Sequence, residues 1–355
     1  MHHGLLHFHP IYKSKVWGGT ALAKLFGRDL PAQDIGESWE LSDRGPDTNA
    51  AALPAHLTGT SLREIIAADS EYILGKGAKA RWSDAKFPLL IKFIDARDDL
   101  SVQVHPHDTY AGRHENEYGK AECWVILHVE PGARIQRGLQ PGTTKKQFAE
   151  ALKKGDVEKL LHYFTPKVGD VLALPTGCVH AIGAGIVLAE VQQNSDVTYR
   201  VFDYNRPGLD GQPRALHIDK ALDVTGFDRY GDEFGDERDL RADVVTPRPV
   251  RSENGLHEEL LADGGRFTLS RLVLQPGAKH RVRAPHTKLG SNPVAGSCEI
   301  WMLLHGRGRA GAGGGGGQPT LDFKPGQTLL VPGGEEQAWI EVDQTATLVR
   351  AIPAQ

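Results

Sequence analysis

The feature of this sequence that most constrains its fold is an internal repeat. The segment ECWVILH at residues 122–128 resembles EIWMLLH at 299–305, and VGDVLALPTGCVH at 168–180 resembles PGQTLLVPGGEEQ at 325–337. Each copy combines short apolar segments with turns that contain Gly and Pro, which is the pattern of antiparallel strands. The repeat therefore predicts two related lobes with the architecture of a duplicated jelly-roll β-barrel.

Helices are expected only as additions to these strands. The segment at residues 143–164 has helical apolar spacing that is interrupted at Gly155 and Asp156, so two short helices are predicted there. A further helix is predicted from Ser61, which has capping-box spacing to Glu64. The predicted fold class is mainly β, with two jelly-roll lobes and small helical insertions.

Three segments of the first lobe contain residues of the types that commonly ligate metals. The segment SVQVHPHD at 101–108 contains Gln103 and His105, which share one face of a strand because side chains at i and i+2 point the same way. Glu122 and His180 lie in the segments GKAECWVIL and PTGCVHAI. Two imidazoles, a carboxylate and an amide oxygen are a suitable ligand set for zinc or a related divalent ion. A single metal site is therefore predicted.

The second copy of the repeat lacks most of this set. Aligning the copies places His280 at the position of Gln103, Val282 at that of His105, Glu299 at that of Glu122 and Gln337 at that of His180. We therefore expect residues 1–240 to form a catalytic metal-binding lobe with helical additions, and residues 241–355 to form a second lobe without a complete metal site. A charged segment at about 228–254 is expected to connect them.

Composition excludes several classes of partner and site. A net charge of −4 with a pI near 6.5 gives no overall basic field for nucleic acid or an anionic membrane. The N-terminal residues lack the pattern of a signal peptide, and no apolar run is long enough to span a bilayer, so a cytoplasmic protein is expected. The three cysteines, Cys123, Cys178 and Cys298, lack the short spacing of a thiolate zinc site and suit a reducing compartment.

Several blocks of the sequence resemble a known family in their order along the chain. These blocks are VWGG, IGESWELS, LIKFIDARDDLSVQVHPHD, GKAECWVIL, LPTGCVHAIG and EVQQNSDVTYRVFDYNR, which lie between residues 16 and 206. They are similar to the signature blocks of class I mannose-6-phosphate isomerases, the zinc cupin phosphomannose isomerases, in their short bacterial-type form. The resemblance implies one Zn²⁺ per chain, held by Gln103, His105, Glu122 and His180. Beyond residue 240 the similarity is limited to general cupin features.

The resemblance also implies catalytic roles for three residues. Arg200 ends the NSDVTYR block, where the family has its active-site arginine, and its fixed charge would stabilise an enediolate oxygen. An ion pair of Arg200 with Asp196 or Asp203 is the structural alternative. Lys120, two residues before Glu122, and Asp196 are competing candidates for the acid or base that moves the proton.

Three further residues are implied to contact the substrate. Lys92 and Ser101 flank the ligand strand in the LIKFIDARDDLSVQ block, where the family binds phosphate. A lysine within an apolar strand is unfavourable unless it is paired, so Asp95 or Asp98 is the alternative partner of Lys92. Trp17, together with Trp39, would form a wall of the sugar site or simply belong to the core.

The resemblance implies an isomerase that interconverts D-mannose 6-phosphate and D-fructose 6-phosphate through a cis-enediolate. The expected partner is therefore a small-molecule sugar phosphate. Two alternatives remain at this point: another cupin sugar-phosphate isomerase, for example one acting on glucose 6-phosphate, and a non-catalytic cupin that binds sugar. A complete ligand set accompanied by Lys120 and Arg200 favours catalysis.

Overall fold

The computed structural model divides the chain into two compact lobes. It describes residues 4–354 apart from 76–85, 228–229, 232, 234–241, 278, 282–287, 290–291, 294–295 and 314–319. The central lobe consists of residues 12–39 and 91–245, and the terminal lobe consists of residues 1–11, 40–90 and 246–355. Because three chain segments build the terminal lobe, the N-terminal strand and the C-terminal repeat belong to the same unit.

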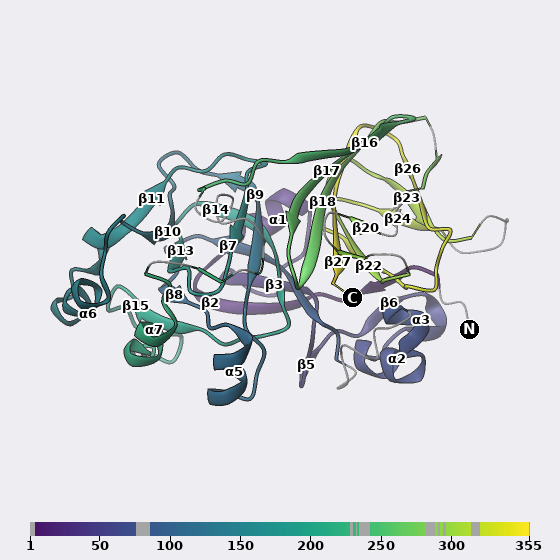
Figure 1. The fold of residues 1–355 in the computed structure, drawn as a ribbon. Coiled ribbons are helices and arrows are strands. Elements are labelled where there is room, and N and C mark those ends of the chain that lie inside the picture. The colour runs from purple at the N-terminus through teal and green to yellow at the C-terminus, as the bar shows by residue number, and fades with distance from the viewer. Residues whose placement is uncertain are drawn as a thin grey trace. The chain divides into compact units, whose positions relative to one another are not determined.

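The central lobe contains a six-stranded and a five-stranded sheet in the described residues (Figure 1). The first has the order β12-β9-β14-β7-β3-β2, formed by Val171–Leu174, Glu122–Val129, Ile186–Gln193, Leu89–Ala96, Ile35–Leu41 and Ile11–Gly19. The second has the order β11-β10-β13-β8-β15, formed by Leu161–Phe164, Ile135–Leu139, His180–Ile182, Val102–Val104 and Tyr199–Phe202. The helices of this lobe are α1 (Ala21–Phe26), α5 (Asp108–His114), α6 (Lys145–Lys154), the 3₁₀ turn η2 (Val157–Leu160) and α7 (Ile218–Val224).

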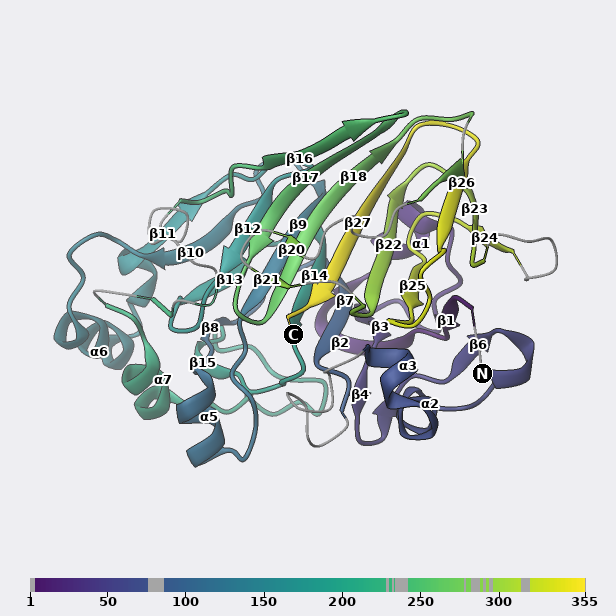
Figure 2. The same cartoon turned by 45° about the vertical axis from the view of Figure 1, so that its right-hand side comes forward.

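The terminal lobe repeats this two-sheet plan (Figure 2). Its eight-stranded sheet, in the order β16-β17-β18-β27-β22-β25-β1-β6, consists of Arg248–Glu253, Leu256–Asp263, Phe267–Leu274, Ala346–Pro353, Glu299–His305, Thr328–Val331, Leu6–Phe8 and Ala51–Leu53. A four-stranded sheet, β19-β26-β23-β24, consists of Lys279–His280, Trp339–Val342, Gly308–Gly311 and Leu321–Phe323. The remaining elements are β4 (Asp43–Arg44), β5 (Asp47–Thr48), β20 (Lys288–Leu289), β21 (Asn292–Pro293), η1 (Ala55–Leu57), α2 (Leu62–Ala68) and α3 (Ser70–Leu74).

The mainly β, two-lobed fold predicted from the repeat is confirmed. The repeated segments have the same register, because β9 pairs Glu122 with Leu174 of β12, and β22 pairs Glu299 with Val331 of β25. Among the described strands no sheet closes on itself, so each lobe contains open sheets rather than a closed barrel. The jelly-roll duplication therefore takes the form of two double-sheet lobes.

Strand periodicity gives the five-stranded sheet two different faces. Val102, Val104, Ala181, Tyr199 and Val201 pack with apolar residues of α6, η2 and α7 in one buried cluster. Alternate residues on the same strands therefore point toward the six-stranded sheet, whose Ile94, Trp124, Leu172 and Leu188 cluster with Ile135 and Ile182. Gln103, His180 and Arg200 lie on this inward-facing side. The outer helices thus fix the sheet while its inner face carries polar groups.

Both predicted helix signals are confirmed. Ser61 and Glu64 form a capping box at the start of α2. The segment at 143–164 forms α6, which ends at Gly155 in a left-handed conformation, followed by η2. Gly155 adopts this conformation without the steric penalty of a Cβ atom, which is why the helix ends there.

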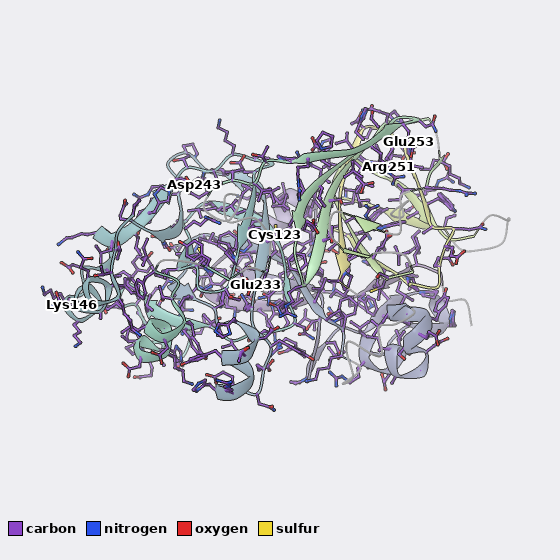
Figure 3. The ribbon with its side chains drawn as sticks, in the orientation of Figure 1. Cys123, Lys146, Glu233, Asp243, Arg251 and Glu253 are labelled. Atoms are coloured by element: carbon purple, nitrogen blue, oxygen red, sulfur yellow. The ribbon has the colours of Figure 1, made fainter. Side chains whose placement is uncertain are left out.

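The segment predicted to connect the lobes is partly outside the described residues, and its last part is not a linker. Residues 248–253 form β16, which pairs with β17. Arg251 donates from Nε to Glu258 Oε2 at 2.8 Å, and Glu253 lies at the end of this strand (Figure 3). The charged composition that indicated a linker is instead that of an edge strand, whose charges discourage pairing with other chains.

Candidate metal centre

Strands of both sheets bring together the four predicted metal ligands of the central lobe. Gln103 on β8 pairs directly with His180 on β13, and Glu122 begins β9. His105 follows β8 directly, and its carbonyl accepts from the backbone N–H of Gly177 in the turn before His180. Gly177 has φ +81°, a conformation that favours glycine, so this turn is locally specified by the sequence.

The ligand atoms lie at the spacing of a small coordination sphere. His180 Nε2 is 3.2 Å from Glu122 Oε1, and His105 Nε2 is 3.6 Å from Glu122 Oε2. The Gln103 atom that lies 3.4 Å from His180 Nε2 is the amide nitrogen Nε2, whereas Gln103 Oε1 accepts from Ser101 Oγ at 3.5 Å. A tetrahedral site with ligand distances of about 2.0–2.2 Å separates neighbouring ligand atoms by roughly 3.3–3.6 Å. The two distances from imidazole nitrogen to Glu122 oxygen are close to this spacing, and the ligand atoms of His105, Glu122 and His180 all lie within 4.8 Å of one another.

In both histidines the Nδ1 atom carries the proton, so the Nε2 atom is free to accept. His105 Nδ1 lies 2.8 Å from Val197 O, and His180 Nδ1 lies 2.9 Å from Cys178 O. A carbonyl oxygen only accepts hydrogen bonds, so each Nδ1 carries the proton and each Nε2 presents a lone pair toward Glu122. Such outer hydrogen bonds orient histidines for metal binding.

Glu122 is the ionised member of this cluster. Burial alone would raise the pKa of Glu122, but the charge of Lys120 holds it well below its usual range. The Oε1 atom is buried and accepts no hydrogen bond from the described residues, although it faces His180 Nε2. Burial, followed by the charge of Lys120, keeps the pKa of His105 well below its usual value, so its imidazole is neutral. A buried anion and neutral nitrogen acceptors facing one another fit a bound cation.

Lys120 is the cation that contacts these ligands directly. Its ammonium donates to His105 Nε2 at 3.1 Å and to Glu122 Oε2. Lys120 is buried and also lines a cavity beside the cluster. Lys120 therefore contacts both the ligand cluster and the cavity.

The cavity beside the cluster measures about 270 Å³ and belongs entirely to the central lobe. The predicted residues that line it are Trp17, Lys92, Ser101, Gln103, Lys120, Asp196 and Arg200. His105, Glu122 and His180 lie deeper, with 2%, 0% and 1% of their surfaces exposed. Trp39 does not line the cavity, and its Nε1 donates to Glu37 Oε2 at 2.6 Å.

Lys92 forms a buried ion triad that sequence reasoning did not identify. Its Nζ lies 3.4 Å from Glu190 Oε1 and 3.9 Å from Glu37 Oε2. Burial alone would lower the pKa of Lys92, but Glu37 and Glu190 raise it above its usual value. The prediction that Asp95 or Asp98 would pair with Lys92 is wrong.

Strand geometry explains that error. Residues 92 and 95 lie on opposite faces of β7, so their side chains do not meet. Asp95 instead accepts from the backbone N–H of Ala21 at 2.5 Å, and Asp98 accepts from Arg97 Nε at 3.1 Å. The signal for the true partner was the glutamate within the apolar segment IVLAEVQQ, which is as unusual as the lysine within LLIKFIDA.

Arg200 is not held by either predicted carboxylate. Its Nε donates to Ser101 Oγ at 3.1 Å and its Nη1 donates to Ala215 O at 3.1 Å, and within the described residues it forms no ion pair. Asp203 is occupied by two other arginines, Arg206 and Arg214. The structural alternative for Arg200, pairing with Asp196 or Asp203, is therefore wrong.

Glu37, Glu190, Arg214 and His217 also line the cavity and were missed by sequence reasoning. Arg214 and His217 follow the last recognised block, in a loop without strand or helix periodicity. No local pattern marks these two residues, because only the folding of the loop brings them to the cavity.

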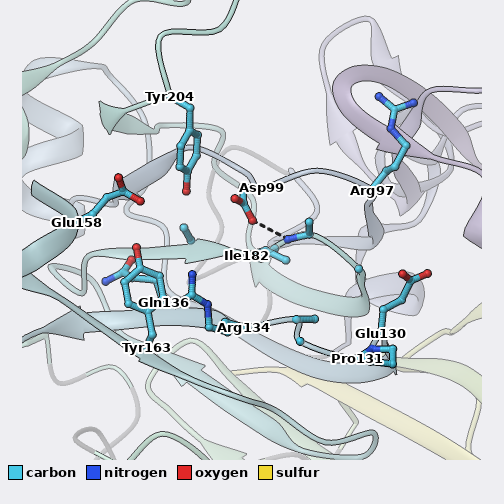
Figure 4. A pocket seen from close by; sticks show the side chains of 16 residues that line it. Arg97, Asp99, Glu130, Pro131, Arg134, Gln136, Glu158, Tyr163, Ile182 and Tyr204 are labelled. Atoms are coloured by element: carbon cyan, nitrogen blue, oxygen red, sulfur yellow. Dashed lines mark hydrogen bonds between the residues drawn. The ribbon is translucent and has the colours of Figure 1, made fainter. Parts of the chain in front are cut away.

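Another cavity in the central lobe lacks this chemistry. It measures about 360 Å³ and is bordered by Asp99, Arg134, Glu158 and Tyr204 (Figure 4). The charged side chains along it are exposed, and none of the predicted site residues lines it. The smaller cavity beside the ligands is therefore the candidate functional site.

The corresponding groups of the terminal lobe are engaged in local hydrogen bonds. His280 Nε2 lies 2.7 Å from Gln275 O, and Glu299 Oε2 accepts from Trp301 Nε1 at 2.9 Å. Val282 lies outside the described residues. In the part of the chain that the structure describes, His105, Glu122 and His180 form the one group of three or more potential metal-binding His, Cys, Asp or Glu side chains.

Cys123, Cys178 and Cys298 are buried free thiols, and Cys123 lies within β9 (Figure 3). Burial raises the pKa of both Cys123 and Cys178. None of the helices built by the described residues is long and apolar enough to cross a membrane.

Comparison with known proteins agrees with the motifs. Residues 5–120 match the family described as phosphomannose isomerase type I, catalytic domain. The chain is 40% identical over 272 residues to a mannose-6-phosphate isomerase of Streptococcus mutans, which covers 77% of this chain and 79% of the relative. It is 40% identical over 220 residues to mannose-6-phosphate isomerase ManA of Bacillus subtilis, which covers 62% of this chain and 67% of the relative.

The fold agrees with the same family. The crystal structure of mannose 6-phosphate isomerase from Bacillus subtilis superposes with a TM-score of 0.82 at 28% sequence identity, covering 98% of this chain and 99% of that structure. The similarity therefore extends through both lobes, beyond the segment that the family description matches. This chain belongs to the type I mannose-6-phosphate isomerase family.

Proposed function

We propose that this protein interconverts D-mannose 6-phosphate and D-fructose 6-phosphate through a cis-enediolate. The observation that carries the proposal is the buried group of His105, Glu122 and His180. It lies beside a polar cavity that Gln103, Lys120 and Arg200 line. Aldose–ketose isomerisation needs a group that moves a proton between C1 and C2, and electrophiles near the two oxygens. Family membership supports the same reaction.

We propose that Gln103, His105, Glu122 and His180 hold one Zn²⁺ per chain. Hydrogen bonds to backbone carbonyls orient the two imidazoles, and Glu122 lies on β9. Gln103 would contribute a neutral amide oxygen once its amide group is turned toward His180. When bound, the ion would supply Lewis-acid polarisation of the sugar oxygens. Because only Glu122 is anionic among the four, the ligands offset a single positive charge.

Lys120 and Asp196 are the proposed groups for proton transfer. Lys120 lines the cavity beside the ligands, and its neutral form accepts a proton. Asp196 contributes an exposed carboxylate to the cavity wall, which accepts a proton directly in its ionised form. Replacing each in turn and following the exchange of the C2 proton with solvent would assign the role.

Arg200 is proposed to stabilise the negative charge of the enediolate. Ser101 and the Ala215 carbonyl fix its guanidinium, and no carboxylate within the described residues neutralises it. Burial, together with the nearby charge of Arg214, lowers the pKa of Arg200, but a guanidinium remains protonated. A fixed positive charge at the cavity is the property that an enediolate oxygen requires.

Lys92, Ser101 and Trp17 are proposed to contact the substrate. All three line the cavity and are buried. Ser101 offers a hydroxyl between Gln103 and Arg200, and Trp17 offers an apolar wall for carbon atoms of the sugar. The charge of Lys92 is balanced by Glu37 and Glu190, so its proposed contribution is that of a hydrogen-bond donor.

A coupled assay tests the proposed function. Fructose 6-phosphate formed from mannose 6-phosphate is converted enzymatically to glucose 6-phosphate and detected through its oxidation. We expect turnover that a chelator removes and added Zn²⁺ restores. Turnover starting from glucose 6-phosphate without turnover of mannose 6-phosphate would contradict the proposal, as would binding of the sugar phosphate without any turnover.

A further inference from the structure

The two ends of the cavity differ in charge. At the buried end, Lys92 lies between two carboxylates, Glu37 and Glu190. Lys92 is 4% exposed, so water does not screen these two pairs. This end therefore has no excess positive charge with which to bind a phosphate dianion.

The partly exposed end has an excess of positive charge. Arg200, Arg214 and His217 line it, and Asp203 pairs with Arg214 but not with Arg200. Arg214 donates to Asp203 from Nε at 2.7 Å and from Nη2 at 2.6 Å. Arg206 donates to the same carboxylate from Nε at 3.2 Å and from Nη2 at 3.0 Å. The three guanidinium groups of Arg200, Arg206 and Arg214 outnumber the carboxylates of Asp203 and of the cavity-lining Asp196, which leaves a net positive charge.

Hydrogen-bond donors remain available at this end. Arg214 uses Nε and Nη2 on Asp203, which leaves its Nη1 group without a partner among the described residues. The backbone N–H of Arg200 donates to His217 Nδ1 at 3.3 Å, so the neutral imidazole carries its proton on Nε2. Burial and the charge of Arg200 lower the pKa of His217, which keeps this ring neutral. A phosphate group accepts such donors with its three terminal oxygens.

This end also lies next to the ligand strand. Arg200 pairs with Gln103 across β15 and β8, and Ser101 Oγ lies 3.1 Å from Arg200 Nε and 3.5 Å from Gln103 Oε1. Arg214 lies beyond Arg200, since the Ala215 carbonyl next to it accepts from Arg200 Nη1. A hexose with C1 and C2 near the ligands would therefore extend its C6 substituent toward Arg214.

We propose that Arg214, assisted by the Nε2–H of His217, binds the phosphate of the substrate. Asp203 holds the guanidinium group of Arg214 in position. The inference rests on the proposed isomerase function and adds the residues that select a phosphorylated sugar. Arg206 shares Asp203 with Arg214 but does not line the cavity. It therefore provides a matched control.

The test compares Arg214→Met with Arg206→Met, which both remove one partner of Asp203 and retain an apolar stem. Steady-state kinetics with mannose 6-phosphate are measured together with competitive inhibition by inorganic phosphate. Arg214→Met should lower kcat/KM about 10- to 100-fold through KM, with kcat nearly unchanged and with a parallel rise in the inhibition constant of phosphate. Arg206→Met should change each value less than about threefold. Equal effects of the two variants, or a fall in kcat alone, would overturn the proposal.

Two further measurements test the phosphate anchor if Arg214→Met does not fold or if the wild type is inactive. If Arg214→Met does not fold, Arg214→Lys is compared with Arg206→Lys, and the proposal requires a higher KM for the first of these variants. If the wild-type protein does not turn over mannose 6-phosphate, the proposed function fails, and calorimetric titration with inorganic phosphate tests the anchor alone. Phosphate affinity that is lost in Arg214→Met but kept in Arg206→Met would still support the anion site, whereas equal affinity in both would overturn it.

Discussion

Lys92 and Lys15 share the carboxylate of Glu37, but only one of the two ion pairs should stabilise the protein strongly. Lys15 lies 3.2 Å from Glu37 Oε1, whereas Lys92 lies 3.9 Å from Glu37 Oε2. Distance alone would make Lys15 the more important partner. The side chain of Lys15 is 33% exposed, whereas that of Lys92 is 5% exposed and also contacts Glu190. Burial therefore reverses the order that distance suggests.

The expected loss of unfolding free energy in each lysine variant follows from this difference in burial. An exposed ion pair typically contributes about 0–1 kcal/mol, so Lys15→Met should lower the free energy of unfolding by no more than that. Removing Lys92 leaves two buried carboxylates without their cation, and breaking a buried pair in this way typically costs about 3–5 kcal/mol. In a lobe of about 180 residues this corresponds to a fall in Tm of about 6–20 °C.

Thermal and urea unfolding of Lys15→Met and Lys92→Met measure this difference. Adding Glu37→Gln to Lys92→Met should recover part of the lost stability, because one of the unpaired charges is then removed. Similar small losses in both lysine variants would refute the assignment of a buried triad. A large loss in Lys15→Met would refute the role of burial.

Three further predictions concern single residues. Arg200→Ala should lower kcat about 100- to 1000-fold without changing metal content or Tm. Arg200→Lys should restore only part of the lost kcat. A normal kcat in Arg200→Ala would show that another residue stabilises the enediolate. Burial alone would raise the pKa of Glu37, but Lys92 and Lys15 lower it to about 2 from 4.5. The ionised form of Glu37 therefore stabilises the protein fully above about pH 4.5, and this stabilisation is lost as the pH falls toward 2. The difference in unfolding free energy between wild type and Glu37→Gln should therefore decrease over that pH range. A difference that does not change with pH would contradict the ion pairing of Glu37. Gly177→Ala should destabilise the protein by about 1–3 kcal/mol in urea unfolding, because φ is +81° and its Cβ would lie 2.9 Å from Val224 O; unchanged stability would argue against this turn geometry.

Local sequence patterns predicted the features that depend on local geometry. Alternation along β8 predicted that Gln103 and His105 would approach the same site, and the Pro-x-Gly turn before His180 predicted the second ligand strand. The capping box at Ser61 was likewise visible from four consecutive residues. These features need only a strand period, a turn or a helix start.

The order of strands within a sheet was not predictable in this way. Glu37, Lys92 and Glu190 lie on β3, β7 and β14, which are neighbours in the six-stranded sheet although the chain separates them widely. A pattern within a single strand shows that Lys92 needs a partner but does not show which strand lies beside it. Asp95 and Asp98 were expected as partners of Lys92 because they are near it in sequence, and this expectation was wrong.

The ion-pair partners in the loop after β15 could not be predicted from the sequence either. Arg200, Arg206 and Arg214 are three similar residues within fifteen positions of the chain, and the sequence does not show which of them Asp203 holds. The folded loop pairs Asp203 with Arg206 and Arg214 and leaves Arg200 at the cavity. Hydrogen bonds among loop side chains decided the outcome, and these have no periodic sequence signature.

We propose that four residues of the central lobe hold one divalent ion on which catalysis depends. The most direct test is the metal content per chain of wild type and of His180→Ala, determined by elemental analysis alongside mannose 6-phosphate turnover. We expect close to one equivalent of zinc in the wild type, and loss of both metal and activity in His180→Ala, because removal of one of four ligands leaves a weak site. Two equivalents per chain, or full activity of His180→Ala in metal-depleted buffer, would contradict it.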